Sequence, residues 1–144
     1  MTVAAILKHK GFDVAFVRPT TRMDEFARLL SGRRIGAAVV QDVAEQVLGI
    51  VSERDVIHAI AANGARALEM TAAQMMTRAV KTATPQTTVA EAMAMMSAGR
   101  FRHLPVMEHG VLVGIISIGD VVKSYITQQE HEVDSLKAYV AGVG

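Results

Sequence analysis

The chain has 144 residues and a formal net charge of +1, with 51% hydrophobic residues, only 4% aromatic residues and no cysteine. This length suits one compact domain or two small modules, and the hydrophobic residues suffice for an aliphatic, methionine-rich core. The absence of cysteine excludes disulfides and thiolate metal sites, and the balanced charge argues against nucleic acid as the main partner.

Residues 3–10 are expected to form a short amphipathic helix that ends at Gly11. Lys8 and Lys10 follow the apolar residues of this segment, which is the wrong order for a secretory signal. No apolar run reaches the roughly 18 residues of a membrane span, so we expect no membrane partner. A cytoplasmic protein is the expectation that fits both observations.

The next part of the chain predicts a module of strand, helix, strand, strand and helix. In order, we expect a strand in 12–17, a helix from Thr20–Thr21 to Gly32, strands at 35–40 and 47–52, and a helix from Glu53 to about residue 62. Met23, Phe26, Ala27 and Leu30 fall at one helical spacing and should form the buried stripe of the first helix.

The same order recurs in the second half of the chain. Pro85 lies 66 positions after Pro19, and Asp120 lies 65 positions after Asp55, so one residue has been lost in a surface turn. We read this as an internal duplication, in which two small modules bury their sheets against each other. The expected divisions are a first module at 11–63, a linker at 64–76, a second module at 77–128 and a helical tail at 129–144.

A seven-residue motif occurs once in each half. The stretch 49–55 reads Gly-Ile-Val-Ser-Glu-Arg-Asp, and 114–120 reads Gly-Ile-Ile-Ser-Ile-Gly-Asp. The pattern predicts a buried strand that ends where a helix begins, with Ser at the N-cap and Asp at the third helical position. Such a junction presents free N–H groups and a positive dipole end to an anion or a polar ligand. The alternative is a purely structural cap, which the short Asp side chain disfavours because a capping box usually has Glu.

The tail continues the last helix with apolar residues on one face. Val133, Leu136 and Val140 resume this spacing after a polar run at 127–132. The tail either folds back on its own chain or packs on a partner subunit.

The two motifs, together with Phe101-Arg102-His103-Leu104-Pro105-Val106 before the second, resemble tandem CBS (cystathionine-β-synthase-type) domains, also called a Bateman module. The resemblance covers residues 11–126 and is closest to the stand-alone bacterial pairs. It implies an α/β (α+β) fold of two pseudo-symmetric β-α-β-β-α modules packed sheet to sheet, with short terminal helices. In that family the clefts between the modules bind adenosine-containing ligands such as AMP, ATP, NAD(H) or S-adenosylmethionine.

The resemblance also assigns roles to individual residues. Asp55 and Asp120 would hold ribose hydroxyls, while the basic Arg102 and His103 would reach phosphate. The first module has Gly36-Ala37 in place of that basic pair, so the two clefts should be unequal. The candidate nucleotide-binding residues are Asp120, Ser117, Ile115, Ile118, Gly119, Arg102, His103, Gly36, Ala37, Asp55, Ser52, Arg54, Ile50 and Thr77.

The sequence offers no catalytic or metal-binding constellation. Ser52 and His58 lie about 9 Å apart along a helix, too far for a relayed hydrogen bond, and the five histidines lack metal-ligand spacing. We therefore expect a non-catalytic regulatory module for energy or redox sensing, a homodimer that acts on a separate effector protein and requires no metal. The alternatives are an oligomerisation module without ligand and a nucleotide-hydrolysing enzyme.

Overall fold

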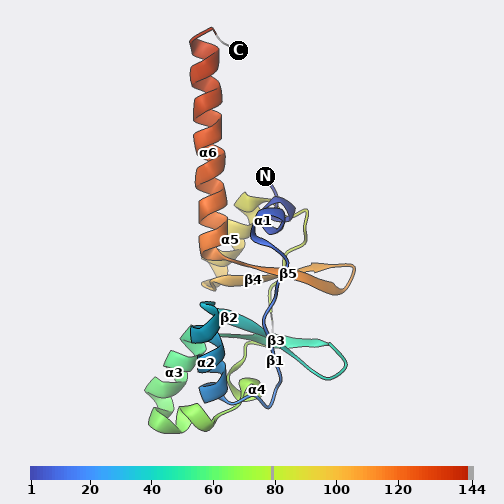
Figure 1. Cartoon of the computed structure of the whole chain (residues 1–144), viewed down its shortest axis with the longest axis vertical. Coiled ribbons are helices and arrows are strands. Elements are labelled where there is room, and N and C mark those ends of the chain that lie inside the picture. Colours follow the sequence, from blue (N-terminus) through green and yellow to red (C-terminus); the bar gives the residue numbers. More distant parts are fainter. Residues whose placement is uncertain (79, 143–144) are drawn as a thin grey trace. The chain divides into compact units, whose positions relative to one another are not determined.

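The computed structural model describes residues 1–78 and 80–142. Its internal contacts form two compact units, each of which mixes helices with a small sheet (Figure 1). Unit 1 contains Met1–Asp13 and Thr82–Gly144, and unit 2 contains Val14–Lys81. The α/β fold class is therefore confirmed, and each unit is described below by itself.

Unit 2 contains a three-stranded sheet covered by helices. Its elements are β1 (Phe16–Val17), α2 (Met23–Arg33), β2 (Ala37–Gln41), β3 (Val47–Ser52), α3 (Glu53–Asn63), the 3₁₀ helix η1 (Gly64–Glu69) and α4 (Ala72–Met75). β1 runs parallel to β2, and β2 runs antiparallel to β3. The strand expected at 12–17 is only two residues long, but β3 and α3 begin and end close to their predicted bounds.

Helix α2 continues past the glycine that we expected to stop it. Met23, Phe26 and Leu30 are buried as predicted, whereas Ala27 is half-buried. The helix runs on to Arg33, and Arg34 closes it in the left-handed conformation with φ of 54°. Gly32 was a wrong stop signal, because a glycine inside a helix costs only about 1 kcal/mol and the buried stripe offsets that cost.

The segment expected to be a linker, 64–76, has regular structure in unit 2. Thr71 and Gln74 form a capping box that begins α4, and Ala67 and Ala72 are fully buried. Because alanine is small, it lets the backbone of this segment lie close to the rest of unit 2. Ala73 N donates a hydrogen bond to Pro19 O at 3.0 Å, which fixes α4 beside the start of α2.

Unit 1 repeats this arrangement with a two-stranded antiparallel sheet. Its elements are α1 (Val3–Lys10), α5 (Val89–Gly99), β4 (His103–Glu108), β5 (Val111–Ser117) and α6 (Ile118–Val140). The recurring order predicts a strand before Pro85, but the structure has only a single parallel bridge there, between Ala83 and Val106. This bridge lies 66 positions after the Val17–Val40 pair of unit 2, so it keeps the symmetry of the duplication.

The N-terminal helix α1 packs with the second module. It ends at Gly11 as predicted, and Val3 and Leu7 are buried in the core of unit 1. Ala4 N donates to Pro85 O at 2.9 Å, which matches the Ala73–Pro19 hydrogen bond in unit 2. Helices α1 and α4 therefore hold equivalent places in the two units, although their sequences differ in length and composition.

Helix α6 is much longer than a short terminal helix. It runs without a break for 23 residues, and its C-terminal half extends away from the rest of unit 1 (Figure 1). Within the described residues the tail therefore does not fold back on its chain; positions 143–144 of the predicted tail lie outside them. Among the described helices none is long and apolar enough to cross a membrane.

Candidate nucleotide-binding site

Both motif copies form the predicted junction between a strand and a helix. Asp55 Oδ2 accepts a hydrogen bond from Ser52 N at 2.7 Å, and Asp120 Oδ2 accepts one from Ser117 N at 2.8 Å. Asp120 N donates in return to Ser117 Oγ at 3.1 Å. These are complete capping boxes, so the argument that the short Asp side chain disfavours a structural cap is wrong.

The helix starts have fewer free N–H groups than the sequence predicts. The N–H of Ile118 donates to Arg102 O at 2.8 Å, and the N–H of Glu53 donates to Gly36 O at 2.9 Å. The capping boxes use further N–H groups of the same turns. Each capping box uses the Oδ2 oxygen of its carboxylate, so the acceptor that it leaves for a ligand is Oδ1.

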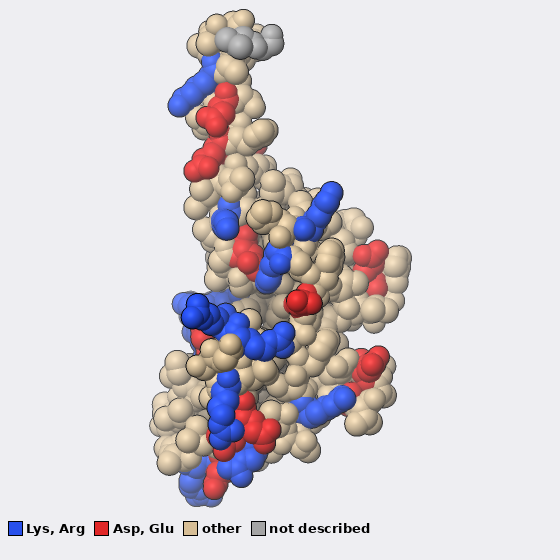
Figure 2. Space-filling view, viewed as in Figure 1, with Lys and Arg blue, Asp and Glu red and all other residues tan. Residues whose placement is uncertain are grey.

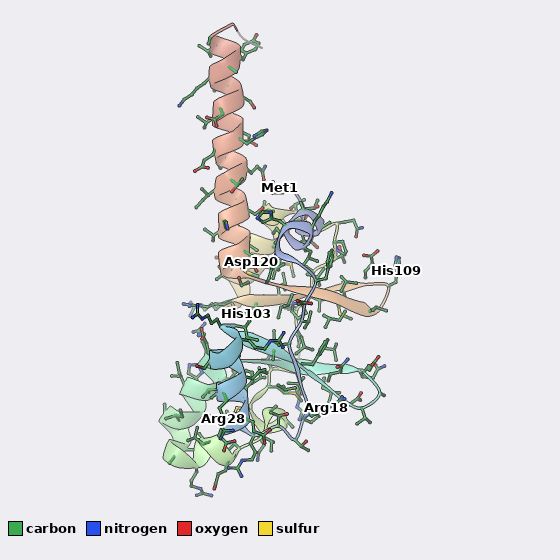
Figure 3. The ribbon with its side chains drawn as sticks, viewed as in Figure 1. Met1, Arg18, Arg28, His103, His109 and Asp120 are labelled. Atoms are coloured by element: carbon green, nitrogen blue, oxygen red, sulfur yellow. The ribbon has the colours of Figure 1, made fainter. Side chains whose placement is uncertain are left out.

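Backbone pairing places predicted residues of each motif beside residues of a neighbouring segment. His103, the first residue of β4, is the cross-strand partner of Ser117, and Ala37 is the partner of Ser52. Thr77 bridges to Ile50 through two backbone hydrogen bonds of 2.9 and 3.1 Å. Figure 3 labels His103 at the start of β4 and Asp120 at the start of α6.

The fourteen candidate residues thus divide evenly between the units. Unit 1 contains Arg102, His103, Ile115, Ser117, Ile118, Gly119 and Asp120, and unit 2 contains Gly36, Ala37, Ile50, Ser52, Arg54, Asp55 and Thr77. Arg102 is exposed just before β4, whereas Ala37 is buried. Charge is therefore available at the strand start of unit 1 but not at the equivalent place in unit 2.

Sequence reasoning missed Lys10 as a site residue. Its ammonium lies 2.6 Å from Asp120 Oδ2 and donates to Ile115 O at 2.8 Å. Burial, the largest influence, raises the pKa of the Asp120 carboxyl, but hydrogen bonds from Lys10 and from Ser117 N outweigh it, so this pKa lies below its ordinary value. Asp120 is consequently held in its ionised form, the form that accepts hydroxyl donors most strongly.

A hollow of about 510 Å³ lies beside this ion pair, between α1 and α6. It is lined by Met1, Ala5, Ile6, His9, Lys10, Asp120, Lys123, Ser124 and Thr127. The positive charge of Lys10 is neutralised by the negative charge of Asp120. Among the side chains that line the hollow, Lys123 then carries a positive charge that Asp120 does not neutralise. No local signal in the sequence pairs α1 with α6, because their contact joins opposite ends of the chain.

The described residues contain no group of three His, Asp or Glu side chains that could hold a metal ion. In unit 1 the candidate site offers the carboxylate of Asp120 as an acceptor, with Lys10 and Arg102 as nearby cations. In unit 2 it offers the carboxylate of Asp55, but no basic residue stands at the start of β2. Both arrangements suit a ligand with adjacent hydroxyl groups, and the first also suits phosphate.

The family model for the CBS domain matches residues 3–62 and 72–127. The chain belongs to the CBS-domain family. It is 32% identical over 149 aligned positions to a mitochondrial CBS domain-containing protein of Arabidopsis thaliana, across 98% of this chain and 72% of the relative. Pairs of CBS domains are generally regulatory rather than catalytic.

Solved CBS structures share the fold. A CBS-domain containing protein from Agrobacterium tumefaciens is 44% identical with a TM-score of 0.84, over 86% of this chain and 92% of that one. A CBS domain protein from Pyrobaculum aerophilum, complexed with AMP, is 26% identical with a TM-score of 0.73, over 83% of this chain and 89% of that one. The predicted resemblance to a CBS pair is therefore confirmed.

Proposed function

We propose that this CBS pair is a non-catalytic regulatory module that binds an adenosine nucleotide, such as AMP, ATP or NAD(H), at its Ser-x-x-Asp helix starts. One observation carries the proposal: both units place an Asp carboxylate at the first turn of a helix with Oδ1 outside the capping box. A carboxylate can accept hydrogen bonds from both adjacent hydroxyls of a ribose. The AMP complex of the Pyrobaculum relative supports a ligand of this class.

We infer that the Asp120 site receives the phosphorylated ligand. Arg102 and His103 lie at the start of the strand that pairs with the strand of Ser117, and Lys10 adds a cation in direct contact with Asp120. Arginine keeps its charge at all working pH values and can hold phosphate through two donors. Unit 2 has Gly36 and Ala37 at the equivalent strand start, so its phosphate affinity should depend on Arg54.

The proposed mechanism is regulation by differential binding. A ligand that binds one conformation more tightly raises its population, and a separate effector protein then recognises that conformation. We propose that the module works as a homodimer in the cytoplasm and senses the energy or redox state through its ligand. The alternatives are an oligomerisation module without ligand and a nucleotide hydrolase.

Thermal unfolding with AMP, ATP, NADH and S-adenosylmethionine tests this proposal. A ligand at 100 times its dissociation constant should raise the free energy of unfolding by about 2.7 kcal/mol. GMP, which shares the ribose and phosphate but not the base, is the matched control ligand. An unchanged midpoint with all four ligands at millimolar concentration overturns the proposal, and consumption of the nucleotide during incubation favours the hydrolase instead.

A further inference from the structure

The C-terminal half of α6 exposes an apolar face. Residues 129–140 are all exposed, including Val133, Leu136 and Val140 at 48%, 62% and 77%. An isolated helical segment of about 12 residues is only marginally stable in water, even with favourable residues. Because this segment is exposed along an apolar face in the single chain, we expect another helix to pack against that face in an assembly.

The apolar residues of α6 follow the spacing of a coiled coil. Positions 122, 126, 129, 133, 136 and 140 are separated alternately by four and three residues, and they carry Val, Ile, Gln, Val, Leu and Val. In heptad terms Ile126, Val133 and Val140 occupy position a, with Leu136 at position d. Branched residues at a with Leu at d favour two parallel strands. The other two d positions carry Val122 and the polar Gln129.

We propose that the α6 tail forms a parallel, in-register, two-stranded coiled coil with a second copy of this chain. The charges beside the seam favour this partner and this direction. Glu132 is at position g and Lys137 at position e, so in a parallel pair Glu132 of each copy faces Lys137 of the other. Figure 2 shows acidic and basic side chains following one another along this protruding part of α6.

The antiparallel alternative brings like charges together. If the same seam pairs about its centre in the antiparallel direction, Glu132 faces Glu132, and Lys123 faces Lys137. Like charges across such a seam are unfavourable. The observed sequence therefore discriminates between the two directions, and a partner with another sequence would lose the reciprocal pairing of Glu132 and Lys137.

This inference deepens the proposed homodimer, because it names the segment and the direction of assembly. A parallel coiled coil places the N-terminal ends of the two α6 helices side by side. Each of these ends carries Asp120 at its third position, so the two Asp120 sites would belong to adjacent helix starts. The assembly itself does not depend on ligand.

Sedimentation equilibrium of two matched variants tests the seam. Val133→Asp puts a charge in the seam and should raise the dimer dissociation constant at least about a hundredfold. Ser135→Asp adds the same charge to the same exposed stretch, but off the seam, and should leave the constant nearly unchanged. Circular dichroism checks that both variants fold. A wild-type monomer at tens of micromolar overturns the homodimer as well, whereas a dimer insensitive to Val133→Asp overturns the coiled coil alone.

Charge reversal and cross-linking test the direction. Lys137→Glu should weaken a parallel dimer, because it places a second carboxylate opposite Glu132, and adding Glu132→Lys should restore it; an antiparallel pair would instead be tightened by Lys137→Glu. The chain has no cysteine, so a single Gln129→Cys variant under oxidised glutathione should form a cross-linked dimer, and the off-seam control Ser135→Cys should not. Cross-linking only between Gln129→Cys and Val133→Cys copies would overturn the parallel register.

Discussion

Lys10 and Asp120, 110 positions apart in the sequence, are joined by an ion pair of 2.6 Å between Nζ and Oδ2. The same ammonium donates to the carbonyl of Ile115 on β5. Helix α1 is therefore tied to the start of α6 at the residue proposed to bind ribose. A ligand at Asp120 must bind to Oδ1 or displace Lys10 from Oδ2. The strength of the Lys10–Asp120 ion pair therefore affects the affinity of the site for its ligand.

Replacing Lys10 with Met should lower the free energy of unfolding at neutral pH by about 1 kcal/mol, because the carboxylate loses a charged partner while the apolar stem remains. The pKa of Asp120 lies below its ordinary value of 3.8 in the folded protein. The stabilisation by its ionised form is therefore present above that value and is lost as the pH falls through the lower, folded pKa. Thermal unfolding at several pH values should show wild type and variant converging in acid.

The control for this variant is Lys8→Met, which removes an exposed lysine from the same helix. It should change the free energy of unfolding little at any pH. A difference between wild type and Lys10→Met that stays constant from neutral to acid pH would contradict the role assigned to the ion pair.

Gly49 and Gly114, which begin the two motifs, should differ in how well they tolerate substitution by alanine. A Cβ at Gly49 would lie 2.5 Å from the backbone oxygen of Thr77, whereas a Cβ at Gly114 would meet the flexible end of Leu7 at 2.7 Å. Gly49→Ala should therefore cost about 1–3 kcal/mol and Gly114→Ala less. Denaturant unfolding measures both, and Gly32→Ala is the control, because it has open space within α2 and should stabilise by about 0.5–1 kcal/mol. Equal losses at Gly49 and Gly114 would show that the backbone contact is not decisive.

Arg102→Ala should weaken the binding of AMP far more than that of adenosine. The lost charge-assisted contact to phosphate is worth roughly 1.5–3 kcal/mol, which is about a ten- to a hundredfold change in affinity. Isothermal titration calorimetry with both ligands separates phosphate recognition from ribose recognition. If the affinities for AMP and adenosine fall by the same factor, Arg102 maintains the structure of the site and does not bind the phosphate.

The Asp120 site should bind AMP more tightly than the Asp55 site. Asp120→Ala is expected to abolish the tighter calorimetric event, while Asp55→Ala leaves it nearly intact, since only unit 1 supplies basic residues at the strand start. Both substitutions remove the Asp side chain of a capping box, so they should lower the stability of the helix that follows by similar amounts. If Asp55→Ala removes the tighter event, Arg54 outweighs Arg102 and Lys10 together, and our ranking of the sites is reversed.

Much of each module could be predicted because the decisive interactions are local. Ser117 and Asp120 are three residues apart, so the capping box forms from neighbouring backbone and side-chain atoms wherever the strand ends. The stripe of Met23, Phe26 and Leu30 likewise depends only on helical spacing. Because the two halves are related by a constant shift in sequence position, predictions made for one module could be applied to equivalent residues of the other.

The sequence by itself determined the order of the main helices and strands in each module, the two helix starts and the family. Only the tertiary structure decided that α1 packs in unit 1, that 64–76 forms part of unit 2, and that Lys10 meets Asp120. Those contacts join segments that no spacing rule relates, because their energy comes from burying apolar surface and pairing charges between elements distant in the chain. The exposed face of α6 lies between these cases, because its apolar pattern is local, whereas the helix that we propose to cover it belongs to a second copy of the chain.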